Sequence, residues 1–70
     1  MKETSSLQLQ VESALLQDRL TEDSDIDVLD NNGIVTLRGV VPSREARDRA
    51  EDITRTVTGV TTVINELDVI

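Results

Sequence analysis

The chain has 70 residues and a formal net charge of -7, with no cysteine, histidine or aromatic residue. This composition excludes disulfides, thiolate chemistry and histidine-based acid–base catalysis, so we expect a non-enzymatic protein without cofactor or metal. The negative charge repels phosphate backbones, and no segment has the ~20 apolar residues of a membrane span, so we expect neither a nucleic-acid partner nor a membrane-spanning chain.

The first ordered element predicted is a helix over residues 7–18. Its apolar stripe recurs at helical spacing and consists of Leu7, Val11, Ala14 and Leu15. Ser6 is a residue type that caps helices. Residues 1–6 are polar and predict a disordered extension without an export signal, followed by a single domain over residues 7–70. The compartment stays open.

Two strands joined by a tight turn are predicted next. Asp25–Val28 alternates between polar and apolar residues, and Asp30–Gly33 is a turn sequence whose Asn-Gly pair tolerates positive φ. The second strand is predicted over Ile34–Val41. Its inward face would carry Val35, Leu37, Gly39 and Val41, and its outward face Ile34, Thr36, Arg38 and Val40.

A second helix and a last strand complete the prediction. Pro42 ends the strand and Ser43 caps the helix, whose buried stripe would be Ala46, Ala50, Ile53 and Val57. The spacing predicts four ion pairs along it: Arg44–Asp48, Glu45–Arg49, Arg47–Glu51 and Glu51–Arg55. Gly59 would end the helix in a left-handed conformation. The last strand is predicted over Val60–Ile70, with Val63, Asn65, Leu67 and Val69 inward.

The order predicts an α+β fold, a two-layer α-β-β-α-β sandwich. The mixed three-stranded sheet would carry both helices on one face, with the last strand parallel to the second. Ala46 and Ala50 would let the second helix approach the sheet closely at Gly39.

These elements together resemble the BON family of bacterial domains. The resemblance lies in Val11-x-x-Ala14-Leu15-x-x-Asp18, Ile26-x-Val28, Asn32-Gly33-x-Val35-x-Leu37-x-Gly39-x-Val41, Arg47-x-x-Ala50 and Gly59-Val60-x-x-Val63-x-Asn65-x-Leu67-x-Val69. It implies the same α-β-β-α-β fold and a role in attachment to phospholipid or other cell-envelope components. Many chains of the family carry two or more copies, and this chain carries one.

Three groups of residues are candidates for function. Ile34, Val40, Ile64 and Ile70 would point away from the helices and could contact a partner domain or a second copy, or could simply be exposed aliphatics. Arg44, Arg47 and Arg55 could contact phosphate head groups, or be neutralised by carboxylates along the helix. The acidic run Glu22–Asp27 does not match a calcium loop, because positions six and twelve counted from Asp23 hold Val28 and Ile34.

The remaining candidates are structural. Gly33, Gly39 and Gly59 mark turns or close approaches, and Asn65 would bond a backbone end near the turn or a helix terminus. Two functions stay open: a module that binds phospholipid or an envelope component, and a protein–protein interaction or assembly domain. We expect a monomer or a weak homo-oligomer.

Overall fold

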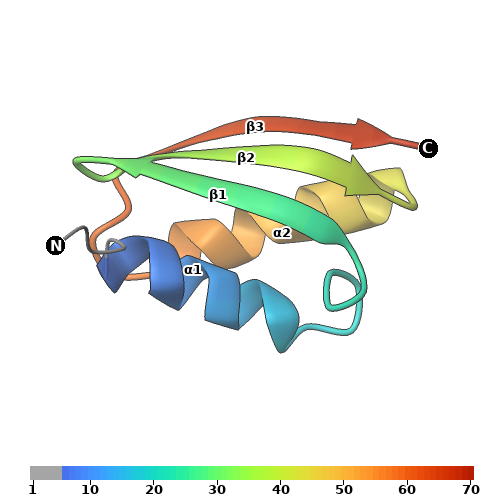
Figure 1. Ribbon diagram of the computed structural model, residues 1–70, viewed down its shortest axis with the longest axis horizontal. Coiled ribbons are helices and arrows are strands. Elements are labelled where there is room, and N and C mark those ends of the chain that lie inside the picture. Colours follow the sequence, from blue (N-terminus) through green and yellow to red (C-terminus); the bar gives the residue numbers. More distant parts are fainter. Residues whose placement is uncertain (1–5) are drawn as a thin grey trace, which may run out of the picture.

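The computed structural model describes residues 6–70, and the predicted disorder of residues 1–5 lies outside that range. The elements are α1 (Ser6–Leu16), β1 (Asp25–Asn31), β2 (Ile34–Val41), α2 (Arg44–Thr56) and β3 (Thr62–Val69). Both helices cover the same side of the sheet, and the other side is open (Figure 1). The predicted two-layer α-β-β-α-β architecture is confirmed. Ser6 belongs to α1, although the prediction placed it just outside the helix.

β2 is the central strand of the sheet, with β1 antiparallel on one side and β3 parallel on the other. The parallel pairing follows from α2, which returns the chain to the starting edge before β3 begins. Leu37 is aligned with Val28 of β1 and Asn65 of β3, so these three residues share the inward face. The predicted direction of the last strand is therefore confirmed.

The hairpin between β1 and β2 is a two-residue turn of Asn32 and Gly33, with φ of 53° and 92°. Two consecutive positive φ values define the turn type that matches the twist of paired strands. The Gly33 N–H donates to Asp30 Oδ1 at 3.0 Å. The Gly33 carbonyl accepts from the Thr61 N–H at 2.8 Å, so the turn also fixes the entry to β3.

Gly39 is required for a reason other than the predicted one. Its φ is +135°, and a Cβ added there would lie 2.1 Å from the carbonyl oxygen of Asp25. The other near neighbours of that Cβ are also Asp25 and Ile26 of β1. The sequence reasoning attributed this glycine to a close crossing of α2, whereas the close contacts of a Cβ at this position come from the neighbouring strand β1.

α2 begins as predicted, and its far end differs. The Ser43 hydroxyl accepts from the Ala46 N–H at 3.1 Å, which confirms the cap. The fully buried residues are Ala46, Ala50 and Thr54, whereas the predicted Ile53 and Val57 are half-buried at the core margin. Thr54 can be buried because its hydroxyl donates to the Ala50 carbonyl at 2.8 Å.

The helix ends at Thr56, with Val57 in an extended conformation as its cap. Gly59, with φ of 104°, lies in the following turn, which the Val60 N–H closes on the Val57 carbonyl at 3.2 Å. The prediction that Gly59 ends the helix is therefore wrong by one turn.

The core lies between the inward face of the sheet and the two helices. Its buried members are all small or medium aliphatics: Val11, Leu15, Val28, Val35, Leu37, Val41, Ala46, Ala50 and Leu67. The loop after α1 joins this layer through Thr21, which is buried and donates its hydroxyl hydrogen to the Leu15 carbonyl at 2.5 Å. Among the helices of residues 6–70, none has the length and apolar character that crossing a bilayer requires.

Candidate binding surfaces

The sheet surface opposite the helices, here called the open face, presents the outward side chains of all three strands. Alternation along each strand places there Asp25, Asp27, Leu29, Asn31, Ile34, Thr36, Arg38, Val40, Thr62, Ile64, Glu66 and Asp68. These side chains sort into an aliphatic end and a charged end.

The aliphatic end consists of Leu29, Ile34 and Ile64, here called the aliphatic patch. Leu29 and Ile64 flank Thr36 in one row across the three strands, and Ile34 is the next outward residue of β2. The three side chains are 50%, 41% and 41% exposed. Leu29 was missed by the sequence reasoning, which ended the first strand at Val28, although the alternation of Asp25 and Asp27 continues through it.

Val40 and Ile70 lie at the opposite end of the open face. A row of charged residues separates them from the aliphatic patch: Asp27 on β1, and Arg38 paired with Glu66 at 2.8 Å. Ile34 and Val40 are six residues apart on one strand, which corresponds to roughly 20 Å. The structure therefore does not gather the four predicted partner residues into one surface.

The end that holds Val40 and Ile70 contains a hollow of about 460 Å³, here called the acidic hollow. Its lining residues are Arg19, Leu20, Asp23, Ser24, Asp25, Val40, Pro42 and Ile70. Val40 is aligned with Asp25 on one side and with Asp68 on the other. An apolar floor is thus bordered by carboxylates.

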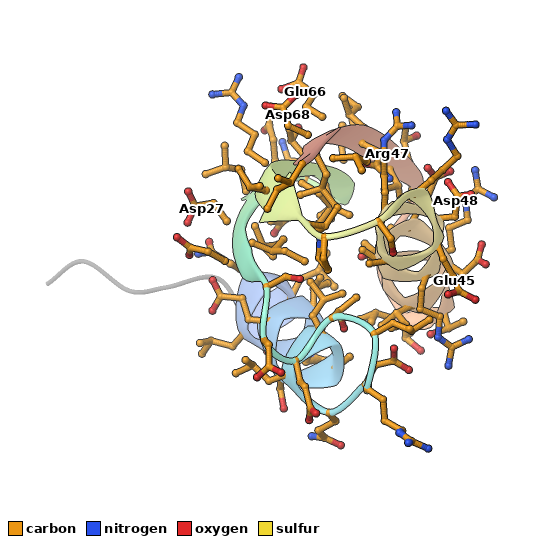
Figure 2. All side chains as sticks on the ribbon, turned by 90° about the vertical axis from the view of Figure 1, so that its right-hand side faces the viewer. Asp27, Glu45, Arg47, Asp48, Glu66 and Asp68 are labelled. Atoms are coloured by element: carbon orange, nitrogen blue, oxygen red, sulfur yellow. The ribbon has the colours of Figure 1, made fainter. Side chains whose placement is uncertain are left out.

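The three predicted head-group arginines differ in their surroundings. Arg55 forms an ion pair with Glu51 at 2.5 Å, as predicted. Arg44 and Arg47 have no ion pair among the described residues, and the Nε of Arg47 is buried without a hydrogen-bond partner there. Figure 2 shows Glu45 and Asp48 on the helix side, and Asp27, Glu66 and Asp68 on the sheet side.

Of the four predicted ion pairs along α2, Glu51–Arg55 alone forms among the described residues. Arg49 reaches instead across to Asp18, in the loop after α1, at 3.0 Å. α2 contains four arginines and four carboxylates, so its net charge is zero. The helix therefore offers local guanidinium groups and no long-range attraction for anions.

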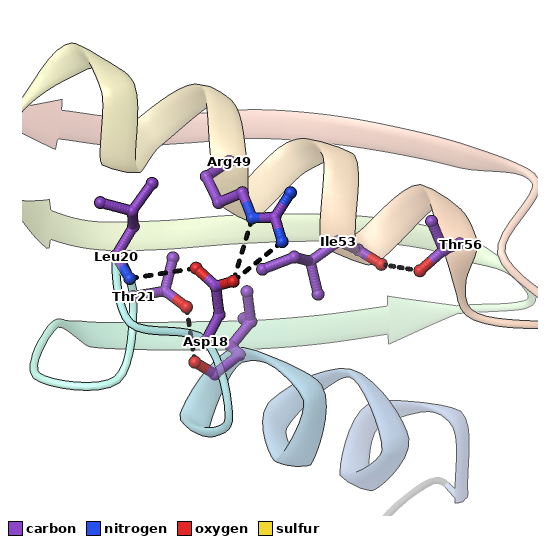
Figure 3. A network of polar contacts seen from close by, with 7 residues as sticks. Asp18, Leu20, Thr21, Arg49, Ile53 and Thr56 are labelled. Carbon is purple, nitrogen blue, oxygen red and sulfur yellow. Dashed lines mark hydrogen bonds and ion pairs between the residues drawn. The ribbon is translucent and has the colours of Figure 1, made fainter.

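The contact between Asp18 and Arg49 ties α2 to the loop that follows α1 (Figure 3). Asp18 also accepts from the Leu20 N–H at 3.0 Å. The hydrogen bond from Arg49 is the main cause that holds the pKa of Asp18 below its usual value. This network is structural, since every partner of the carboxylate lies within the fold.

Asn65 is bonded internally on the inward side of β3. Its side-chain amide donates to the Arg47 carbonyl at 3.0 Å and to Glu51 Oε1 at 3.3 Å, and its Oδ1 accepts from the Leu67 N–H at 3.1 Å. The carbonyl belongs to the body of α2 and not to the turn or helix terminus that the sequence suggested. Asn65 therefore couples β3 to α2.

A second hollow, of about 590 Å³, runs between α1 and the end of α2. Its lining residues are Ser6, Leu9, Gln10, Ser13, Ala14, Gln17, Thr56, Val57 and Thr58, and none of these is charged. Sequence reasoning missed this groove because its two walls are distant in the chain. It contains no titratable group that could act as an acid or a base.

Within residues 6–70, no three acidic side chains gather closely enough to hold a metal ion, and this includes the run Glu22–Asp27.

The comparison with protein families gives a match over most of the chain. No curated protein matches the chain. The family model described as "BON domain" matches residues 3–70, nearly the whole chain. The motifs from Val11 to Val69 and the observed α-β-β-α-β order agree with that match. The chain belongs to the BON domain family.

Proposed function

We propose that this domain is a non-catalytic binding module that attaches to phospholipid or to another component of the cell envelope. The family supports this proposal, because BON domains are regarded as attachment modules of this kind. The observation that carries it is the aliphatic patch. Leu29, Ile34 and Ile64 are adjacent, are each about half exposed, and lie on a face that neither helix covers.

The size of the patch sets the expected strength of binding. Full burial of an aliphatic side chain contributes about 1.5–3 kcal/mol, so covering three half-exposed ones contributes roughly 3 kcal/mol in all. That amount alone corresponds to an affinity weaker than about 1 mM. Attachment through the patch therefore needs further contacts on the open face. Attachment through Arg44 and Arg47 would depend instead on head-group contacts of about 1 kcal/mol each.

The patch and the arginines belong to different layers of the domain. The patch lies on the open face, whereas Arg44 and Arg47 lie on α2, on the other side of the sheet (Figures 1 and 2). A flat bilayer cannot contact both layers fully at the same time. Variants of each surface therefore distinguish two modes of attachment.

Co-sedimentation with vesicles tests the proposal. The vesicles are phosphatidylcholine alone and phosphatidylcholine mixed with phosphatidylglycerol, each at low and high salt. Ile34→Lys with Ile64→Lys removes the aliphatic patch, and Arg44→Gln with Arg47→Gln removes the head-group contacts. Leu9→Lys with Leu16→Lys is the matched control, because it adds the same charge at two leucines of α1 that are 53% and 63% exposed, away from the open face.

Each outcome identifies a surface. Loss of binding in the isoleucine pair assigns attachment to the open face. Loss in the arginine pair, with binding that weakens as salt rises, assigns it to head groups. If the wild-type domain sediments with neither vesicle, phospholipid is excluded as the component.

A second candidate function is contact with another protein through the open face. The charged end of that face favours it, because carboxylates around an exposed aliphatic floor repel an anionic bilayer and attract a basic surface.

A further inference from the structure

We infer that the acidic hollow binds a segment of a partner protein that carries aliphatic side chains flanked by lysine or arginine. The inference rests on the second candidate function, protein contact through the open face. It gives that function a location and a partner chemistry.

The apolar floor of the acidic hollow is formed by Leu20, Val40, Pro42 and Ile70. Leu20, Val40 and Ile70 are 38%, 44% and 88% exposed, so each keeps apolar surface that the core does not cover. The volume of about 460 Å³ lies within the range of roughly 300–1,000 Å³ that is typical of ligand sites. An inserted aliphatic side chain would contact this floor on several sides.

Negatively charged residues outnumber positively charged ones at the border of the hollow. Asp23 and Asp25 line it, and Asp68 flanks Val40 from β3. None of these three carboxylates forms an ion pair among residues 6–70, and Arg19 is the one basic residue of the lining. Carboxylates left without partners around an apolar floor complement a segment in which basic and aliphatic residues alternate.

The same charges argue against other occupants. A second copy docked by the same surface would bring Asp25 and Asp68 against their equivalents. Phosphate groups of a bilayer or of nucleic acid would be repelled by this border and by the net charge of -7. A basic and aliphatic protein segment meets neither obstacle.

The ion pair between Arg38 and Glu66 bounds the site toward the aliphatic patch. This row of paired charges separates the two apolar surfaces of the open face, so each can be tested alone. Substitutions in the acidic hollow leave Leu29, Ile34 and Ile64 unchanged.

The test is an NMR titration of the ¹⁵N-labelled domain with three capped synthetic peptides. The probe is Gly-Lys-Leu-Lys-Val-Lys-Gly. One control replaces each lysine by glutamate, and the other replaces the leucine and the valine by serine. We expect saturable shifts with the probe alone, at Leu20, Asp25, Val40 and Ile70, which weaken as salt rises.

Two pairs of substitutions make the test specific. Asp25→Asn with Asp68→Asn should weaken the binding of the probe about tenfold, because two exposed charge pairs are lost. Glu45→Gln with Asp52→Asn removes the same charge from α2 and should leave the affinity unchanged. Circular dichroism checks that all variants are folded.

The inference is overturned by equal shifts with the serine peptide, by shifts spread over α2 or the aliphatic patch, or by no saturable shift. Shifts at the hollow that grow with domain concentration in the absence of peptide would overturn it in favour of a second copy. Vesicle binding without peptide binding would refute this site and leave the proposed function standing. Peptide binding without vesicle binding would support this site and exclude phospholipid as the component that the domain binds.

Discussion

Replacing Gly39 by alanine should destabilise the domain far more than the same change at Gly59. Both glycines have positive φ, a conformation that costs a residue with a side chain about 1–2 kcal/mol. At Gly59 the new methyl group would meet the Leu7 side chain at 3.4 Å, which is an ordinary contact. At Gly39 it would lie 2.1 Å from the Asp25 carbonyl oxygen, so β1 would have to move away from β2.

That movement would weaken neighbouring hydrogen bonds between β1 and β2, each worth about 1 kcal/mol. We therefore expect a loss of about 3–4 kcal/mol for Gly39→Ala and about 1–2 kcal/mol for Gly59→Ala. A domain of this size has a total stability of roughly 4–10 kcal/mol, so the first variant would lose about a third of its stability or more.

Urea denaturation followed by far-ultraviolet circular dichroism measures both variants, since the chain has no tryptophan or tyrosine for fluorescence. With a slope of about 1 kcal/mol/M, the two midpoints should differ by about 2 M. If the two variants have midpoints within experimental error of each other, the proximity of β1 is not what requires glycine at position 39.

Three further substitutions test other contacts of the fold. Ser43→Ala should cost about 1 kcal/mol in the same urea experiment, and Ser43→Asp should retain most of the stability because it can still accept from the Ala46 N–H. Asn65→Ala should cost about 1–3 kcal/mol through the loss of its three hydrogen bonds. Asn65→Asp should cost more, since a carboxylate would face the Arg47 carbonyl and Glu51. Equal stability of the two variants would contradict this order. Asp18→Asn should reduce the loss of stability at acidic pH. The pKa of Asp18 is lowered in the folded state, so its contribution to stability is complete above its usual pKa of 3.8 and disappears as pH falls through the folded value. Urea midpoints measured from neutral to strongly acidic pH test this, and an equally steep loss of stability in the variant would refute the role of Asp18.

The parts of the fold that sequence reasoning predicted correctly are those with a local cause. Alternation between Ile34 and Val41 depends on neighbouring residues, and so do the Asn32-Gly33 turn and the Ser43 cap. Each can be recognised from a few consecutive positions. The topology followed from them, because a helix between two strands favours a parallel crossover.

The errors concern contacts between distant segments. Arg49 has a local carboxylate at the predicted spacing, yet it pairs with Asp18 from the preceding loop. Thr54 is fully buried in place of its more apolar neighbours, which depends on how α2 packs against the rest of the fold; the bond from its hydroxyl to the Ala50 carbonyl permits this burial. Gly39 was correctly identified as special, but its cause is the approach of β1, which depends on strand register.

The candidate surfaces were predictable in composition and not in arrangement. Strand parity placed Ile34, Val40 and Ile64 on the outward side, and their exposure of 41–44% agrees with that placement. The alternation of residues along one strand could not show that a charged row separates Val40 from Ile34 and Ile64. That separation depends on which residues of β1 and β3 are aligned with Arg38. Their role as a partner surface stays a prediction.

Because the core lies on one side of the sheet, a ligand bound to the open face would prolong the lifetime of the folded chain. Short aliphatics pack against one side of a single sheet, so the free domain has little thermodynamic reserve. A ligand that binds only the folded state at a hundred times its dissociation constant would add about 2.7 kcal/mol to that reserve. A domain that has engaged its target would then resist unfolding and proteolysis, while unoccupied copies would be degraded first.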